Sequence, residues 1–62
     1  MENIDIERLR KDLEDYFLGI MFNVSKAAMI DLTNVQNASD EELISIAIAN
    51  GVDIDDYKIK SY

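Results

Sequence analysis

Residues 20–35 read IMFNVSKAAMIDLTNV, and this stretch is apolar on more than one face of any helix that it forms. Its two charges, Lys26 and Asp31, cancel, whereas both flanks are acidic. Residues 27–30 read AAMI, and at about 100° per residue they sweep most of the way around a helix axis. A helix that buries one stripe in its own core does not need such a run. We therefore expect the segment to be covered from two sides, once by the rest of the chain and once by a second copy or another protein.

The length and composition favour oligomerisation as the way in which so small a fold is stabilised. The 62 residues make one domain, 1–62, and a chain of this length buries only about 60% of its unfolded surface. Cysteine and histidine are absent, which excludes disulfides and the common zinc sites. The sequence carries no catalytic or metal-binding signature, so we expect neither an enzyme nor a cofactor.

The net charge of −7 is concentrated toward the two ends of the chain. Residues 1–18 hold six acids and three bases (net −3), and residues 37–62 hold six acids and two bases (net −4). Residues 19–36 are neutral. An acidic surface repels nucleic acids and anionic membranes, so we expect direct contact with neither. It suits a basic-surfaced protein partner, or it serves solubility alone.

The N-terminus and the hydropathy pattern favour a cytoplasmic protein. The chain begins MENIDIE, which is acidic where a secretory signal would be basic. The sequence has no apolar run that approaches the roughly 18 residues of a membrane span.

The spacing of apolar residues predicts an all-α fold of three helices. The first is expected over 4–18, where one face follows a 3-4-3-4 spacing. Gly19 either ends this helix or marks a close backbone approach. The second is expected over 24–36 with Asn23 as its N-cap. Because no proline intervenes, a single bent helix over 4–35 is an open alternative. The apolar stripe of the first helix consists of Ile6, Leu9, Leu13, Tyr16 and Ile20, widened by Phe17.

The third helix has the most explicit local signals. Residues 39–42 read SDEE, which is a capping box: the Ser39 hydroxyl accepts from the Glu42 backbone, and the Glu42 side chain reaches back. The pair Asn50 and Gly51 is expected to stop this helix, with the glycine in a left-handed conformation.

The tail from Val52 to Tyr62 has two interpretations. In one, Asp53 caps a further turn that folds Tyr57 back onto the core. In the other, residues 57–60 alternate like an edge strand.

Residues 42–52, ELISIAIANGV, resemble the first half of a helix-turn-helix, in which an alanine precedes the turn glycine by four residues. Ala47 and Gly51 have that spacing, and the resemblance implies a DNA-reading helix over 53–58. Three aspartates would then face phosphate, which opposes that function. The segment is also similar to LysM repeats and to leader peptides of ribosomally made peptides. A LysM repeat needs a preceding strand, which residues 33–41 do not resemble, and a leader needs a core peptide beyond Tyr62.

Two groups of carboxylates are the remaining candidates for chemistry. The first consists of Asp53, Asp55 and Asp56. It lacks the central glycine and terminal glutamate of a calcium-binding EF-hand loop. The second consists of Asp12, Asp15, Asp40 and Glu42. No histidine, cysteine or glycine-rich loop supports these residues, so acid–base catalysis is not expected.

The candidate site is therefore an interaction surface. Methionine and aromatic side chains are favoured at adaptable interfaces. We expect a homodimer interface within residues 20–35, flanked by an acidic surface that can meet a basic partner. The expected interface residues are Ile20, Met21, Phe22, Ala27, Met29 and Ile30. The acidic surface consists of Asp53, Asp55 and Asp56.

By size, acidity and lack of cysteine, the chain resembles the small inhibitors that phages and other mobile elements direct against host defence or regulatory proteins. The resemblance implies a non-enzymatic protein-binding function in the cytoplasm of a bacterial or infected host cell. Two alternatives stay open. One is a structural or housekeeping helical dimer, and the other is a helix-turn-helix-like transcriptional regulator, which the acidic charge disfavours.

Overall fold

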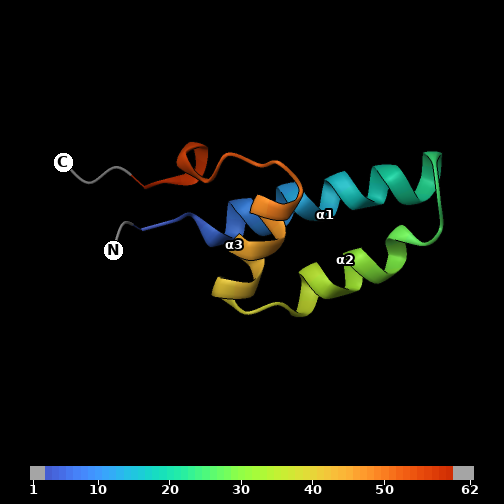
Figure 1. Cartoon of the computed structure of the whole chain (residues 1–62), viewed down its shortest axis with the longest axis horizontal. Coiled ribbons are helices and arrows are strands. Elements are labelled where there is room, and N and C mark those ends of the chain that lie inside the picture. The colour runs from blue at the N-terminus through green and yellow to red at the C-terminus, as the bar shows by residue number, and fades with distance from the viewer. Residues whose placement is uncertain (1–2, 60–62) are drawn as a thin grey trace.

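The first two helices form an antiparallel hairpin that gives the molecule its long axis (Figure 1). A computed structural model describes residues 3–59. Helix α1 spans Ile6–Asn23, helix α2 spans Ala28–Asn37, and residues 24–27 turn the chain between them. The molecule measures 42 × 19 × 17 Å, and the roughly 27 Å of α1 runs along its long axis (Figure 1). Over residues 3–59, the prediction of an all-α fold with three α-helices is confirmed.

Helix α1 is longer than predicted, because Gly19 does not end it. The helix begins after Asp5, whose side chain accepts a hydrogen bond from the Arg8 backbone at 3.2 Å. It continues through Gly19 to Asn23. A Cβ placed on Gly19 would meet no atom within 4 Å, so this glycine is neither a stop nor a close contact. The apolar side chain of Ile20 packs against the core, which favours helix beyond the glycine.

The predicted N-cap of the second helix is also wrong, because α1 extends through this residue. Asn23 is the last residue of α1, and its side-chain amide donates to the Gly19 carbonyl at 2.9 Å. Helix α2 begins four residues later than expected, at Ala28, with no side-chain cap. The Ser25 hydroxyl accepts from the Ala27 backbone at 3.1 Å and stabilises the turn. This turn also rules out one continuous helix over 4–35.

Helix α3, Asp40–Ala49, begins and ends as its sequence predicts. The capping box is present, with both reciprocal bonds between Ser39 and Glu42. Gly51 has a φ of +80°. The Val52 amide donates to the Ala47 carbonyl at 2.9 Å, and the Gly51 amide donates to a carbonyl in the last turn. These two bonds make a Schellman motif, which satisfies carbonyls that the helix leaves open.

The C-terminal segment forms a single 3-10 turn, η1, over Ile54–Tyr57. The Asp53 side chain accepts from the Asp55 backbone at 2.9 Å and caps the turn, which confirms the first interpretation of the tail. An isolated antiparallel bridge joins Ile4 to Lys58, but no strand forms within residues 3–59. Lys60, the last residue of the alternative edge strand over 57–60, lies outside the described residues. The DNA-reading helix implied over 53–58 is likewise wrong, since η1 is only four residues long.

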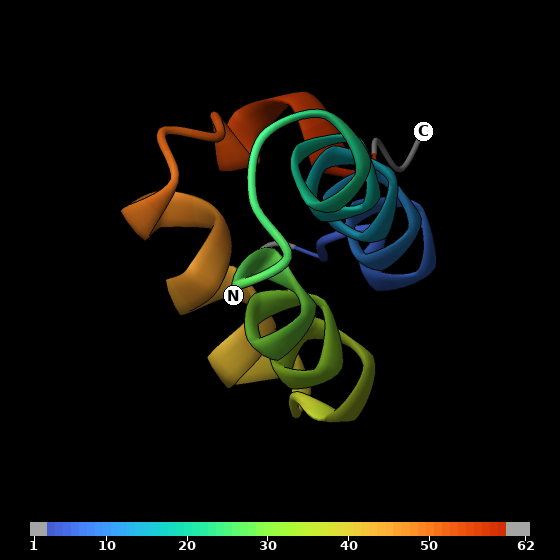
Figure 2. The same ribbon diagram turned by 90° about the vertical axis from the view of Figure 1, so that its right-hand side faces the viewer.

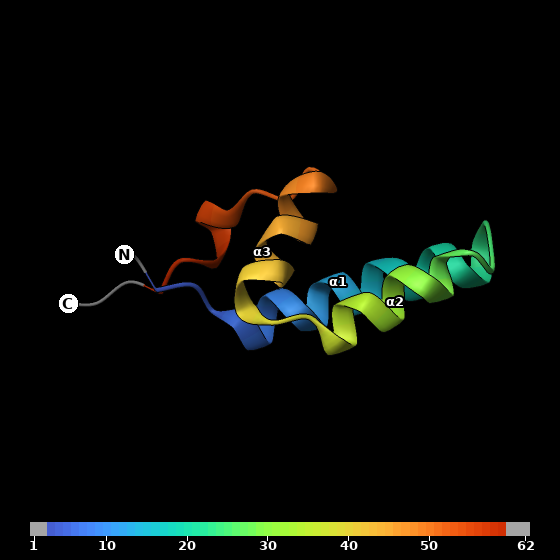
Figure 3. The ribbon, with the colours of Figure 1, turned by 60° about the horizontal axis from the view of Figure 1, so that its bottom comes forward.

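The buried core lies where α3 crosses the hairpin, toward the end at which α1 begins (Figures 1 and 3). Viewed along the hairpin, the three helices surround a common centre, and η1 covers the side between α1 and α3 (Figure 2). The core side chains are those of Leu9, Leu13, Phe17, Val35, Ala38, Leu43 and Ala47. The far end of the hairpin extends beyond α3 (Figure 3).

Candidate functional site

The end of the hairpin exposes an apolar surface, which we call the hairpin tip and define as residues 22–30. Four of its large side chains are mostly exposed: Phe22 (78%), Val24 (79%), Met29 (57%) and Ile30 (68%). Apolar residues scattered singly over a surface are normal, but apolar residues gathered in one place mark interaction sites. The tip therefore has the composition of a protein-binding surface.

The fold explains why these side chains find no cover within their own chain. Helix α2 turns Ala28 and Val35 inward, where both are buried. Met29 and Ile30 follow Ala28 on other sides of the same helix, and α3 crosses the hairpin nearer its other end (Figure 3). The composition of this segment predicts that two of its sides are covered. The rest of the chain covers one of them, and the other side is exposed.

The structure divides the six expected interface residues into two groups. Ile20 and Met21 are half-buried, and Ile20 packs against the core. The other four are exposed, and they are Phe22, Ala27, Met29 and Ile30. Val24 belongs with them but is missing from the expected set. The helix expected over 24–36 begins at Val24, whereas this residue lies in the turn between α1 and α2.

Two opposite charges accompany the apolar side chains of the tip and its edge. Lys26 lies in the turn and Asp31 in the first turn of α2, and both are exposed. Neither takes part in an ion pair within residues 3–59. The surface is therefore electrically neutral in a molecule whose net charge is −7.

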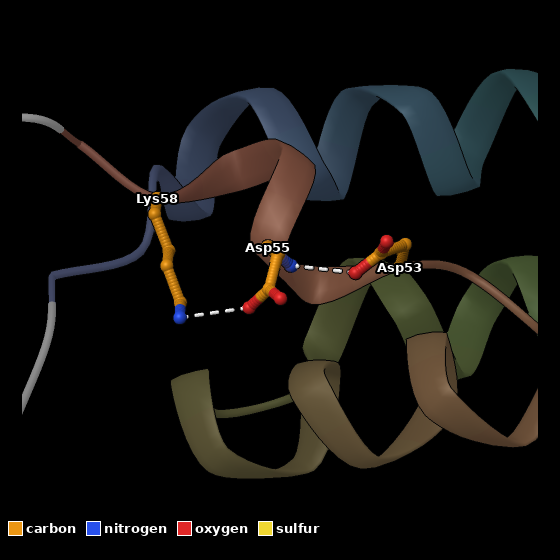
Figure 4. A network of polar contacts seen from close by, with 3 residues as sticks. All are labelled: Asp53, Asp55 and Lys58. Atoms are coloured by element: carbon orange, nitrogen blue, oxygen red, sulfur yellow. Dashed lines mark hydrogen bonds and ion pairs between the residues drawn. The ribbon is translucent and has the colours of Figure 1, made fainter.

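The predicted acidic surface lies on and beside η1, at the end of the molecule away from the tip (Figure 1). Asp53 caps η1, and Asp55 forms an ion pair with Lys58 at 2.7 Å (Figure 4). The backbone carbonyl of Asp56 accepts from Arg8 at 3.5 Å. Two of the three carboxylates thus have local partners that reduce the charge they offer to another molecule.

Tyr57 links η1 to α1 through its phenol. Its hydroxyl donates a hydrogen bond to Oδ2 of Asp12, and the Arg8 guanidinium lies 5.0 Å from its ring centroid. The hydrogen bond to Asp12 raises the pKa of Tyr57 above its ordinary value of 10.0, and partial burial adds to the effect. The sequence places Tyr57 near the core but gives no sign of these two partners, since each lies more than 40 residues away.

The carboxylates considered for acid–base chemistry do not form a common site. Asp12 contacts Tyr57, and Glu42 belongs to the capping box of α3. Within residues 3–59, no group of three or more histidine, cysteine or acidic side chains is placed to hold a metal ion. None of the helices in this part of the chain is both long and apolar enough to span a membrane. Comparisons with protein-family models, curated proteins and solved structures gave no match.

Proposed function

We propose that this protein is a non-enzymatic protein-binding module that forms a homodimer through its hairpin tip. The observation that carries the proposal is the exposure of Phe22, Val24, Met29 and Ile30 at one end of the hairpin. Burying such side chains contributes about 25 cal/mol per Å² of apolar surface. Aromatic residues and methionine also supply much of the contact area in the centres of known interfaces.

Charge favours a second copy of the chain as the occupant of the tip. The molecule carries −7 overall, so two copies repel one another wherever their acidic parts meet. The tip and the adjacent Asp31 are together neutral, and they lie at one end of a molecule 42 Å long. Pairing tip to tip holds the two η1 ends far apart compared with the ~8 Å screening length at physiological salt. A strongly basic partner would instead be drawn toward the acidic end.

The dimer leaves its acidic ends available to other proteins. A charged outer surface accelerates encounters with an oppositely charged partner before apolar contacts form. Together with the resemblance in size and acidity to mobile-element inhibitors, this arrangement supports inhibition of a host defence or regulatory protein as the cellular role.

Sedimentation equilibrium at micromolar concentration tests the proposed dimer. We expect twice the chain mass of 7.1 kDa. Phe22→Ser should weaken the dimer by at least about tenfold, because it removes a large aromatic contact from the interface. Ile48→Ser is the matched control, since Ile48 is also exposed (62%) but lies on α3. A monomeric wild-type protein, or equal weakening by the two substitutions, would refute the proposal.

A further inference from the structure

A concave feature away from the hairpin tip lies between α1, the end of α3 and η1. It is a cavity of about 210 Å³, and none of its lining residues belongs to the hairpin tip. It is lined by Asp12, Leu13, Tyr16, Asn50, Val52 and Tyr57. Pockets for drug-sized ligands and cofactors are larger, roughly 300–1,000 Å³. The cavity therefore has room for a single side chain, such as the anchor residues that fill pockets at protein interfaces.

The electrostatics of this cavity favour a cation. Asp12 is its charged residue, and a carboxylate that accepts one bond from Tyr57 still has lone pairs for other donors. Asn50 is the C-cap of α3, so the negative end of that helix dipole meets the cavity wall. The last turn of α3 has no basic residue to offset it. The half-exposed ring of Tyr16 offers a further surface that attracts cations.

The walls also suit an aliphatic stem. Leu13 is buried and Val52 is half-buried, and both line the cavity. An arginine side chain combines an apolar stem with a planar guanidinium that stacks on aromatic rings and binds carboxylates. The chain's own arginines, Arg8 and Arg10, are engaged within the fold by Tyr57 and by the carbonyls at the end of α2. Neither arginine of the chain is therefore available to fill the cavity, which leaves it open to an arginine of a partner.

We propose that this cavity receives an arginine side chain of a partner protein, with its stem on Leu13 and Val52 and its guanidinium between Asp12 and Tyr16. The site is independent of the proposed dimer and gives the acidic end of the molecule a specific point of recognition. It also differs from the Asp53, Asp55 and Asp56 surface, since none of those carboxylates lines the cavity.

Titration of the isotope-labelled protein with n-butylguanidinium, followed by amide NMR shifts, tests the proposal. The neutral 1-pentanol and the anionic pentanoate serve as matched probes of similar length. We expect saturable shifts of the Tyr16, Asn50 and Val52 amides, and we expect the affinity to decrease from guanidinium to alcohol to carboxylate. The guanidinium should bind at least about threefold more tightly than the alcohol.

Two substitutions on α1 distinguish binding in the cavity from nonspecific attraction between opposite charges. Asp12→Asn preserves an acceptor for Tyr57 but removes the charge, so it should abolish the preference for guanidinium over alcohol. Asp15→Asn removes an exposed charge from the same helix outside the cavity and should preserve that preference. Phe22→Ser should also bind the guanidinium normally, which keeps this result separate from the dimer test. Equal binding of guanidinium and alcohol to the wild type, or equal effects of the two aspartate substitutions, would overturn the proposal.

Discussion

Arg10 connects α1 to the end of α2 through a fork of hydrogen bonds. Its Nη1 donates to the Val35 carbonyl at 2.7 Å, and its Nη2 donates to the Ala38 carbonyl at 3.0 Å. The last turn of α2 contains no basic residue of its own. Arg10 therefore neutralises the negative end of α2 and fixes its position against α1.

Replacing Arg10 should destabilise the fold. We expect Arg10→Met to lower the free energy of unfolding by about 1–3 kcal/mol, because carbonyls at the end of α2 lose a charged donor. Arg10→Lys should recover only part of this loss, since an ammonium group lacks the planar fork. Urea denaturation measures the effect. The neighbouring Lys11 is exposed, so Lys11→Met is the matched control and should leave the midpoint nearly unchanged.

The raised pKa of Tyr57 predicts that the free energy of unfolding decreases at alkaline pH. Its pKa is raised in the folded protein by the hydrogen bond to Asp12, so the folded state retains this proton at a pH where the unfolded chain has lost it. The stabilisation is fully present below the ordinary pKa of 10.0 and is lost as the pH rises through the higher folded value.

Tyr57→Phe should remove this part of the alkaline stability loss. It should also lower the free energy of unfolding at neutral pH by about 0.5–1.5 kcal/mol, the contribution of a typical hydrogen bond. The comparison is made by urea denaturation across the pH range. The same alkaline slope in Tyr57→Phe and wild type would show that the hydrogen bond does not cause it.

At the scale of elements, the two glycines of the chain have opposite structural meanings. Gly19 lies inside α1 with open space around the site of a Cβ, whereas Gly51 has a φ of +80° in the Schellman motif. Gly19→Ala should stabilise the protein by about 0.5–1 kcal/mol, because it restricts the unfolded chain and favours helix. Gly51→Ala should destabilise it by about 1–2 kcal/mol, because a side chain is strained at positive φ. Thermal unfolding of both variants checks the opposite signs.

Some helix boundaries could be predicted from the sequence, and others could not. Both ends of α3 depend on residues within three or four positions of one another, so Ser39, Glu42 and Gly51 sufficed. The end of α1 depends on packing of Ile20 onto a core that the local pattern does not contain. Asn23 illustrates the ambiguity, since its amide is as able to bond back to Gly19 as its oxygen is to cap a following helix.

The candidate sites likewise divide into one that could be predicted from the sequence and others that could not. The hairpin tip was accessible to sequence reasoning because excess apolar residues are visible in composition. The contacts of Arg10 and Tyr57 were not, since they join residues 25 or more positions apart. At the spacing of one helical turn, Glu14 is the expected partner of Arg10, yet the arginine side chain reaches α2 instead. The 210 Å³ cavity likewise depends on three elements meeting.

At the scale of the whole molecule, the separation between neutral tip and acidic end predicts how dimerisation responds to salt. Above about 0.1 M salt, charges repel over ~10 Å or less, so the tip-to-tip dissociation constant should change little. At about 0.01 M the screening length grows to ~30 Å, and the dimer should weaken as the acidic ends begin to repel. Sedimentation equilibrium across this range measures the change. Continued strengthening well above 0.1 M would indicate an interface that includes the acidic end.

The position of the core at one end of the hairpin also sets how the molecule opens. Leu9 and Leu43 are fully buried, whereas Phe22 and Val24 at the tip are mostly exposed. Backbone amides at the tip should therefore exchange with solvent through local fraying, and those beneath α3 only through global unfolding. Protection from hydrogen exchange should then decline along the long axis toward the turn. A dimer formed through the tip would instead protect the amides near the turn and so reverse the gradient there. Binding of the second copy would then be coupled to the rigidity of the hairpin.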